Sequence, residues 1–317
     1  MSEWQTKQAG ERVIQFFVIQ DRAVKTASNQ SEYMHITLSD ASGTLQARLW
    51  DVTEKQKEAF QPRMVVKVDG RIEFFRGIRE LHIYRIRLAT EEDQLSMEQL
   101  VPHARRSKDE MWREIIGVIE QVKSPVLSRV LKTVANNREL RDALTSYPAS
   151  KAYHHAYYAG LLEHMVTLSR AVRALSPVYE VNRDEMLALC ILHDAGKVRK
   201  FSNAAAPQVT KQGELFGHLI LSSDILLEAA DEAGISRDHP EIETLRHSIL
   251  SHYGDVENGW GSPVSGRTRE AVLFHYLDQL DSKLSAMSQA AESASDTARG
   301  VYVPMLKRNM YAGEDLS

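Results

Sequence analysis

The sequence has little of what secreted or membrane-spanning proteins require. It contains one cysteine, Cys190, so no disulfide can form within the chain, and we expect a reducing compartment, the cytoplasm. The apolar run Met186–Leu192 is far shorter than the roughly 20 residues that span a bilayer. The first ten residues, MSEWQTKQAG, lack the apolar stretch of a signal peptide. We therefore expect no membrane partner.

The composition is not extreme in charge or in hydrophobicity. Charged residues make up 26% of the 317 residues, hydrophobic residues make up 43%, and the formal net charge is −4. These values are ordinary for a globular protein and exclude a disordered one. At roughly 150 residues per domain, the length predicts about two domains. The function must therefore be sought in the placement of particular side chains.

The first part of the chain, residues 1–90, is predicted to be a small β domain. Apolar and polar residues alternate there in runs bounded by turn residues, as in strands with one buried face. The expected strands are Val13–Ile19, Tyr33–Ser39, Thr44–Trp50, Met64–Phe75 and Glu80–Leu88. A polar segment after the third strand, Val52–Phe60, is expected to be a short helix. Five strands with a helix after the third resemble the barrel of an OB-fold.

Two neighbouring strands of this barrel carry aromatic and basic side chains on their outward face. The alternation places Tyr33 and His35 outward on one strand, and Arg48 and Trp50 outward on the next. Aromatic side chains beside cations hold single-stranded nucleic acid by stacking. The alternative is that these aromatic residues pack against the rest of the protein. The pattern alone leaves both interpretations open.

The remainder of the chain is predicted to be helical. Apolar residues recur there at a spacing of 3.6 residues, with Gly and Pro between the segments. We interpret residues 91–150 as a helical connector and residues 151–317 as an all-α bundle that ends in a short tail. The expected fold is therefore a β-barrel followed by a helical bundle.

Four side chains interrupt apolar helical segments of the second part. His164 lies within an apolar helical stripe, His193 and Asp194 end an apolar run, and Asp278 interrupts a later helix. Gly196 is expected to cap the helix of His193 at its C-terminal end. A buried His-Asp pair is costly unless another group pairs with it.

Such a set of side chains suits a divalent metal, because imidazole nitrogens and carboxylate oxygens bind Mn, Fe, Zn or Co. A single aspartate can bridge two ions, and two ions about 3.5–4 Å apart activate a phosphodiester for hydrolysis. His218, His247 and His252 are candidates for the second ion. The last two are about 140° apart around a regular helix, so both face one site only if the helix ends or bends near Ser251. The alternative is a set of packing histidines with an ion-paired Asp278 and no metal.

The order of these residues resembles the HD-domain superfamily of metal-dependent phosphohydrolases. Longer strings resemble one branch of it, the YhaM-type 3′-5′ exoribonucleases, in which an OB-fold precedes the HD domain. The matching strings are Tyr147–Lys151, His154–His164, Leu192–Lys197, Gly213–His218, Leu245–Gly254, Trp260–Pro263 and His275–Asp281. The chain departs from the family pattern at Ala159–Gly160, where Gly-Gly is common, and at Ser251–His252, where two histidines are common.

The resemblance implies a role for each candidate residue. The first ion would be held by His164, His193, Asp194 and Asp278. Asp194 would bridge to a second ion, held by His218, His247 and His252. Asp194 and Lys197 would be catalytic, with Lys197 neutralising the scissile phosphate; the alternative for Lys197 is a solvated lysine. The candidates for orienting ligands or touching phosphates are His154, His155, His275 and Asp281.

The expected function is a metal-dependent 3′-5′ exonuclease that shortens single-stranded RNA, or single-stranded DNA, to nucleoside 5′-monophosphates. We prefer Mn as the metal, with Fe, Co, Zn or Mg as alternatives. One rival interpretation is an HD-type phosphohydrolase of nucleotides or cyclic dinucleotides. Another is a non-catalytic single-strand-binding protein. The barrel favours a polymeric substrate, and the intact set of candidate ligands favours an enzyme.

Overall fold

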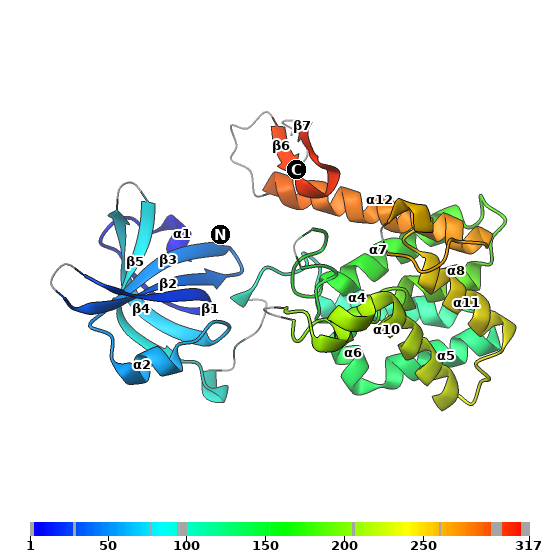
Figure 1. Cartoon of the computed structure of the whole chain (residues 1–317), viewed down its shortest axis with the longest axis horizontal. Helices are drawn as coiled ribbons and strands as arrows, with labels where there is room; N and C mark the ends of the chain where they lie inside the picture. The colour runs from blue at the N-terminus through cyan, green and yellow to red at the C-terminus, as the bar shows by residue number, and fades with distance from the viewer. Residues whose placement is uncertain are drawn as a thin grey trace. The chain divides into compact units, whose positions relative to one another are not determined.

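A computed structural model describes residues 3–27, 30–75, 78–93, 95, 100–151, 153–204, 207–259, 261–292 and 300–311. The chain divides into two compact units, Met1–His103 and Ala104–Ser317 (Figure 1). Trp260, which begins one of the matching strings, lies outside the described residues.

The first unit is a closed five-stranded barrel, as the alternating pattern predicts. The strands are β1 (Arg12–Thr26), β2 (Glu32–Asp40), β3 (Gly43–Trp50), β4 (Val65–Phe75) and β5 (Ile78–Leu88). They pair in the order β1-β2-β3-β5-β4, with β3 parallel to β5 and the other pairs antiparallel. The short helices are α1 (Glu3–Thr6), α2 (Glu54–Ala59) and η1 (Glu91–Asp93).

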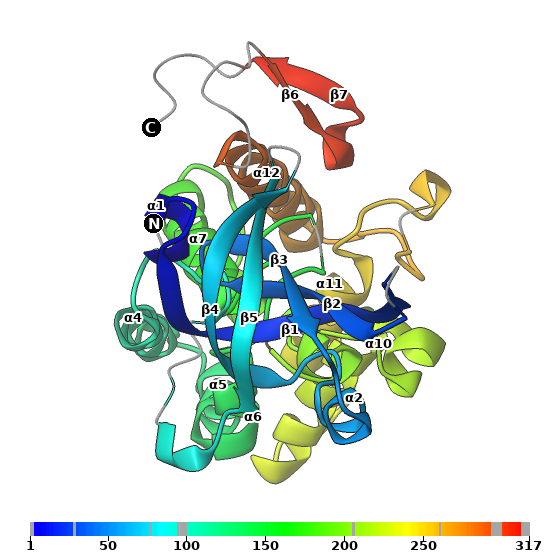
Figure 2. The same ribbon diagram turned by 90° about the vertical axis from the view of Figure 1, so that its left-hand side faces the viewer.

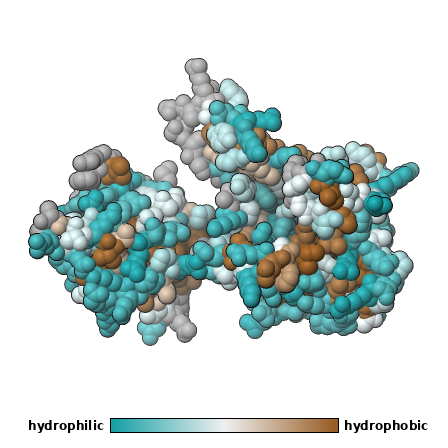
Figure 3. Space-filling model, in the orientation of Figure 1, coloured by the Kyte–Doolittle hydropathy of each residue, from teal (hydrophilic) through white to brown (hydrophobic). Residues whose placement is uncertain are grey.

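The alternation along the strands builds the core of the barrel. Met34 and Ile36 on β2 and Ala47 on β3 are fully buried. A register shift opposite Asp69/Gly70, where Tyr84 is the extra residue on β5, bends β5 where it meets β4. Gly70 is required there, because a Cβ atom on it would lie 2.5 Å from the carbonyl oxygen of His82. In the view of Figure 3 the outer surface of the barrel is mostly hydrophilic, with scattered apolar spots.

The second unit is a bundle of helices. Its longer helices are α4 (Lys108–Gln121), α5 (Pro125–Asn136), α7 (Gly160–Leu175), α8 (Arg183–Leu192), α10 (Lys211–Glu232), α11 (Pro240–Ser251) and α12 (Arg269–Glu292). The shorter ones are α6 (Arg138–Leu144), α9 (Lys197–Lys200), η2 (Val256–Asn258) and η3 (Pro304–Leu306). Within the described helices, none is both long enough and apolar enough to cross a membrane.

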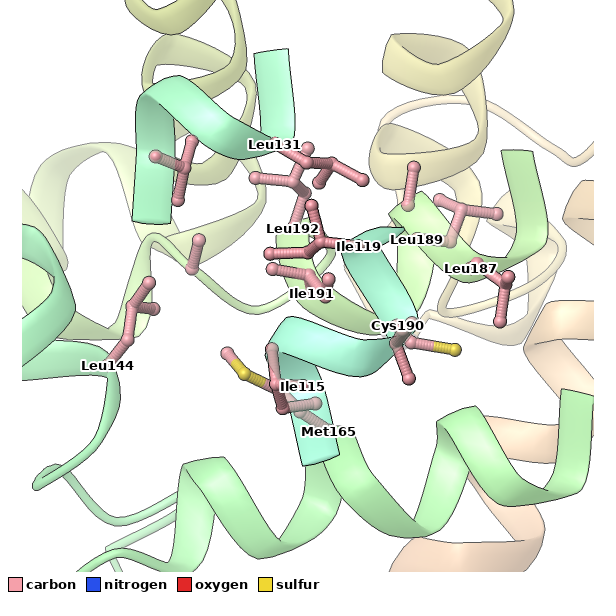
Figure 4. Close-up of a cluster of buried hydrophobic side chains, with 14 of the residues drawn as sticks. Ile115, Ile119, Leu131, Leu144, Met165, Leu187, Leu189, Cys190, Ile191 and Leu192 are labelled. Atoms are coloured by element: carbon pink, nitrogen blue, oxygen red, sulfur yellow. The ribbon is translucent and has the colours of Figure 1, made fainter. Parts of the chain in front are cut away.

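Helix α8 lies at the centre of the bundle. Its residues Met186–Leu192 are all buried, and they meet apolar side chains of α4, α5 and α7 (Figure 4). Cys190 is among them, so the single cysteine is a packing residue. A helix buried on all sides brings His193 and Asp194, which follow it directly, into the interior.

The segment interpreted as a connector belongs to this bundle. Met111 and Ile115 of α4 and Leu131 of α5 are buried in the same core as α8. The division between the units falls between His103 and Ala104 instead of around residues 91 and 150. The physical reason is that the apolar stripes of α4 and α5 need partners to bury them, and α7 and α8 provide these.

Helix α12 is apolar on more than one face. Phe274 and Leu277 point inward, whereas Tyr276, Leu280 and Leu284 are more than half exposed. A hairpin of β6 (Gly300–Val303) and β7 (Arg308–Tyr311) packs against this helix (Figure 2). The short tail expected after the bundle therefore contains regular structure.

Candidate metal centre

His164 lies on the inward face of α7 and is fully buried. Its Nδ1 atom is 2.6 Å from Asp281 Oδ2, and its Nε2 atom is 3.1 Å from Asp278 Oδ1 and 3.2 Å from His193 Nε2. Because a carboxylate only accepts, Nδ1 donates to Asp281. Nε2 is thereby directed at the other candidate ligands.

His193 and Asp194 leave the C-terminal end of α8 and remain buried. His193 Nδ1 donates to the carbonyl oxygen of Leu189 at 2.9 Å, which leaves the lone pair on Nε2. Gly196 is not the C-terminal cap that we expected, since its φ is −62° and it precedes α9. It is needed for close packing, because a Cβ atom would lie 2.3 Å from the carbonyl oxygen of His218.

His218 comes from α10, where the backbone leaves the helical conformation at Gly217, with φ of 69° and ψ of 163°. His218 therefore begins a new helical segment. Its Nε2 atom lies 3.4 Å from Asp194 Oδ1. Burial lowers the pKa of His218 well below its ordinary value, so the ring is neutral and available as a ligand at pH 7.

His252 caps the C-terminal end of α11, so the helix ends at Ser251, as a shared site would require. Its Nδ1 atom donates to the carbonyl oxygen of Ile249 at 2.7 Å, and its Nε2 atom lies 4.0 Å from Asp194 Oδ1. His247 is not brought to this place. Its Nε2 atom accepts from the backbone N–H of Arg267 at 2.9 Å, and the ring is half-buried.

The two oxygens of Asp194 face two different groups of side chains. Oδ2 lies 3.3 Å from His193 Nε2 and 3.7 Å from His164 Nε2, and Asp278 completes this group. Oδ1 faces His218 and His252 instead. This is the arrangement of a carboxylate that bridges two positions for cations.

The donor set fits a divalent metal. Asp194 Oδ1, His218 Nε2 and His252 Nε2 are buried and have no hydrogen-bond partner. A buried polar atom without a partner is costly. Each of these three atoms has a lone pair that can coordinate a cation. Nitrogen and carboxylate ligands of this kind bind divalent ions of the first transition row.

Lys197, on α9, is buried and its ammonium group bonds Asp194 Oδ2. It is therefore not a solvated lysine behind a helix cap. Its position beside Asp194 places a positive charge at the edge of the cluster. A charge held there is suited to a phosphoryl oxygen.

The four residues that were candidates for orienting ligands or touching phosphates have different surroundings. Asp281 accepts from both His164 and His155, at 2.6 and 2.9 Å. His275 lies behind the cluster, where its Nδ1 donates to the carbonyl oxygen of His252 at 2.8 Å. His154 is half-buried, and its Nδ1 has no partner. Burial, with a smaller effect from the charge of Lys197, lowers the pKa of His154 to about 3, so its ring is neutral.

The sequence did not single out two further residues near the cluster. The ring of Tyr253 lies against those of His218 and His252, with centroids 5.3 and 4.7 Å apart. Lys200 lies one turn after Lys197, and burial and then the charge of Lys197 lower its pKa. Tyr253 is adjacent to a candidate ligand, which was the one signal that the sequence offered.

The outward face of β2 and β3 has the four side chains that the alternation placed there. Tyr33 pairs with Trp50, with ring centroids 4.6 Å apart, and His35 pairs with Arg48. All four are partly exposed. Arg48 forms an ion pair with Glu80 of β5 at 3.0 Å, an interaction that the sequence did not indicate.

Comparison with known proteins agrees with both units. Residues 17–89 match an OB-fold nucleic acid binding domain, and residues 161–283 match the HD domain. The 3′-5′ exoribonuclease YhaM of Bacillus subtilis (strain 168) is 33% identical over 286 residues, which cover 90% of this chain and 89% of that protein. The YhaM protein of Listeria monocytogenes serotype 4b (strain F2365) is 35% identical over 283 residues, 89% and 88% of the two chains.

Among solved structures, a replication protein A heterotrimer bound to ssDNA is 17% identical and covers 28% of this chain and 64% of that one. Its TM-score of 0.22 is too low to support a conclusion. The relatives, by contrast, align over nearly the whole chain, barrel and HD domain together. This chain belongs to the YhaM family of 3′-5′ exoribonucleases.

Proposed function

We propose that this protein is a metal-dependent 3′-5′ exonuclease that degrades single-stranded RNA to nucleoside 5′-monophosphates. The observation that carries the proposal is the position of Asp194, whose two oxygens face separate groups of buried histidines. The names of the relatives support the direction of degradation and the choice of RNA. A cytoplasmic location remains part of the proposal.

Six side chains would hold two ions. The first position has His164, His193 and Asp278, with one oxygen of Asp194. The second has His218 and His252, with the other oxygen. His247 is left out because its Nε2 already accepts a hydrogen bond. We prefer Mn, since a mixed set of imidazole and carboxylate ligands accommodates it.

The bound ions would supply Lewis acidity and a nucleophile that is available near neutral pH. The chain's own groups would act on the substrate around them. Lys197 would neutralise charge on the phosphoryl oxygens, from its place beside Asp194. His154, whose Nδ1 is unpartnered, would contact a substrate oxygen. The ring of Tyr253 would limit the space beside His218.

The barrel would bind the polymer upstream of the scissile bond. The stacked pair Tyr33 and Trp50 offers an aromatic surface to unpaired bases, and this type of contact does not depend on sequence. The match to an OB-fold nucleic acid binding domain supports single-stranded nucleic acid as the partner.

The test is an assay with a 5′-labelled oligoribonucleotide in Mn²⁺, with the matching DNA oligonucleotide and with mononucleotides as competing substrates. The proposal predicts a ladder of shortened RNA products and release of nucleoside 5′-monophosphates. A matched control is the same RNA with a blocked 3′ end, which should not be shortened. Cleavage of mononucleotides or cyclic dinucleotides alone would favour the rival phosphohydrolase.

A further inference from the structure

A chain of hydrogen-bonded side chains runs from His164 away from the candidate metal positions. Asp281 Oδ2 lies 2.6 Å from His164 Nδ1 and 2.9 Å from His155 Nε2. His155 Nδ1 lies 2.9 Å from the hydroxyl of Tyr157, which in turn bonds Glu163 Oε2. This series of hydrogen bonds thus joins α12, the segment before α7, and the first turn of α7.

The backbone of His155 is held in an unusual conformation. Its φ is +44°, a left-handed value that is uncommon for residues other than glycine. Its N–H donates to Ser285 Oγ of α12 at 3.0 Å, and its carbonyl oxygen accepts from Ala149 at 3.1 Å. A Cβ atom on Gly160 would lie 2.1 Å from that carbonyl oxygen, so Gly160 is needed for the approach. Several contacts therefore fix where the imidazole points.

The hydrogen bonds have a defined direction at Asp281. One oxygen of Asp281, Oδ2, lies within hydrogen-bond distance of both His164 Nδ1 and His155 Nε2. As a carboxylate Asp281 only accepts, so both imidazoles donate to it. His164 is thereby held with its hydrogen on Nδ1 and with Nε2 facing His193 and Asp278.

We propose that His155, Tyr157 and Glu163 are positioning residues that hold Asp281, and through it the ring of His164, in the geometry that binds the first metal ion. The proposal rests on the proposed function, because it assigns the ion to His164. The second hydrogen bond to Oδ2 prevents Asp281 from turning away from His164. Tyr157 and Glu163 prevent the His155 ring from turning in the same way.

A purely structural role is the competing explanation. The same contacts tie the segment that contains His155 to α12, so they also contribute to the stability of the fold. In that case, removing them lowers the free energy of unfolding and leaves the metal affinity of the folded protein unchanged. Metal affinity measured on folded, full-length protein therefore separates the two roles.

The experiment is a calorimetric titration of the metal-free full chain with MnCl₂, with circular dichroism to confirm folding. His155→Ala should weaken Mn²⁺ binding at the first position by up to about 10- to 100-fold, the effect of losing the hydrogen-bond partner of a ligand, because His155 acts on His164 through Asp281. His155→Gln should recover most of that affinity, because its amide N–H reaches about as far as the imidazole Nε2. Tyr157→Phe should weaken the site about 2- to 10-fold, the range for one lost hydrogen bond.

Tyr158→Phe is the matched control, since it removes a neighbouring hydroxyl that bonds Ser146 and not this chain of side chains. Its affinity should equal that of the wild type. Unchanged affinity in folded His155→Ala or Tyr157→Phe would overturn the inference, and so would equal losses in His155→Ala and His155→Gln. If the wild type itself neither binds Mn²⁺ nor shortens RNA, the proposed function fails instead.

Discussion

At the residue scale, the cluster keeps its imidazoles in different charge states. Burial lowers the pKa of His252 to about 4, so this ring is neutral at pH 7. Burial also acts to lower the pKa of His164, but hydrogen bonds to Asp278 and Asp281 outweigh it and raise that pKa to about 10. In the metal-free protein a proton on His164 Nε2 would therefore occupy the position proposed for the first ion.

Binding of the first metal ion should release about one proton at pH 7.5, because His164 must lose its proton to become a ligand. The sign follows from the raised pKa: the affinity should increase about tenfold per pH unit up to about pH 10 and then level off. Calorimetry in buffers of different ionisation enthalpy measures the proton count. Asp281→Asn, which removes one cause of the raised pKa, should release less. An affinity independent of pH between 6 and 9 would contradict this account.

At the element scale, α7 is preceded by a residue in the left-handed conformation. Ala159, the residue before the helix, has φ of +61° and is buried. The departure from Gly-Gly therefore has a conformational cost, because the left-handed region disfavours a residue that has a Cβ atom.

Ala159→Gly should therefore raise the free energy of unfolding by about 0.5–1 kcal/mol. The substitution relieves the left-handed strain in the folded protein, and this gain exceeds the loss that comes from a more flexible unfolded chain. The neighbouring change Gly160→Ala should lower it by about 1–3 kcal/mol or more, because the new Cβ atom would meet the carbonyl oxygen of His155. Urea denaturation of both variants makes the comparison. A less stable Ala159→Gly variant would show that the buried methyl group matters more than the strain.

The elements also show which features of the fold were predictable. Alternating residues identified β2 and β3 and the correct outward face, because one side of each strand is buried. The parallel pairing of β3 with β5 was not predictable, since it depends on how the barrel closes. Residues of α4 and α5 share the core of the bundle, a contact that the sequence did not indicate because an apolar stripe does not reveal its partner. The network of His155, Tyr157 and Glu163 joins residues more than a hundred positions from Asp281, and no local pattern indicates such contacts.

At the scale of the whole molecule, the proposed function assigns binding of the polymer to one unit and chemistry to the other. The barrel presents Trp50 and Tyr33, and the bundle encloses the candidate metal centre. The two should therefore respond to different substitutions. The ion pair between Arg48 and Glu80 also means that Arg48 is partly neutralised before any nucleic acid binds.

Trp50→Ala should weaken binding of a single-stranded oligoribonucleotide by about 1–3 kcal/mol, the value of one stacked base. It should leave the number of bound metal ions unchanged, since Trp50 lies in the other unit. Fluorescence anisotropy at a fixed salt concentration measures the first quantity. Tyr311→Ala, which removes an exposed aromatic ring from β7, is the control and should bind like the wild type. Equal binding by Trp50→Ala would mean that this face has a structural role.

The most direct test of the central claim is to count the metal ions bound to the purified full chain by elemental analysis after dialysis against Mn²⁺. The account predicts about two ions per chain in the wild type, because one carboxylate serves two groups of ligands. His218→Ala should retain about one ion, and Asp194→Ala, still folded by circular dichroism, should retain none. A folded Asp194→Ala protein that keeps the wild-type metal content would contradict the claim that Asp194 bridges the site.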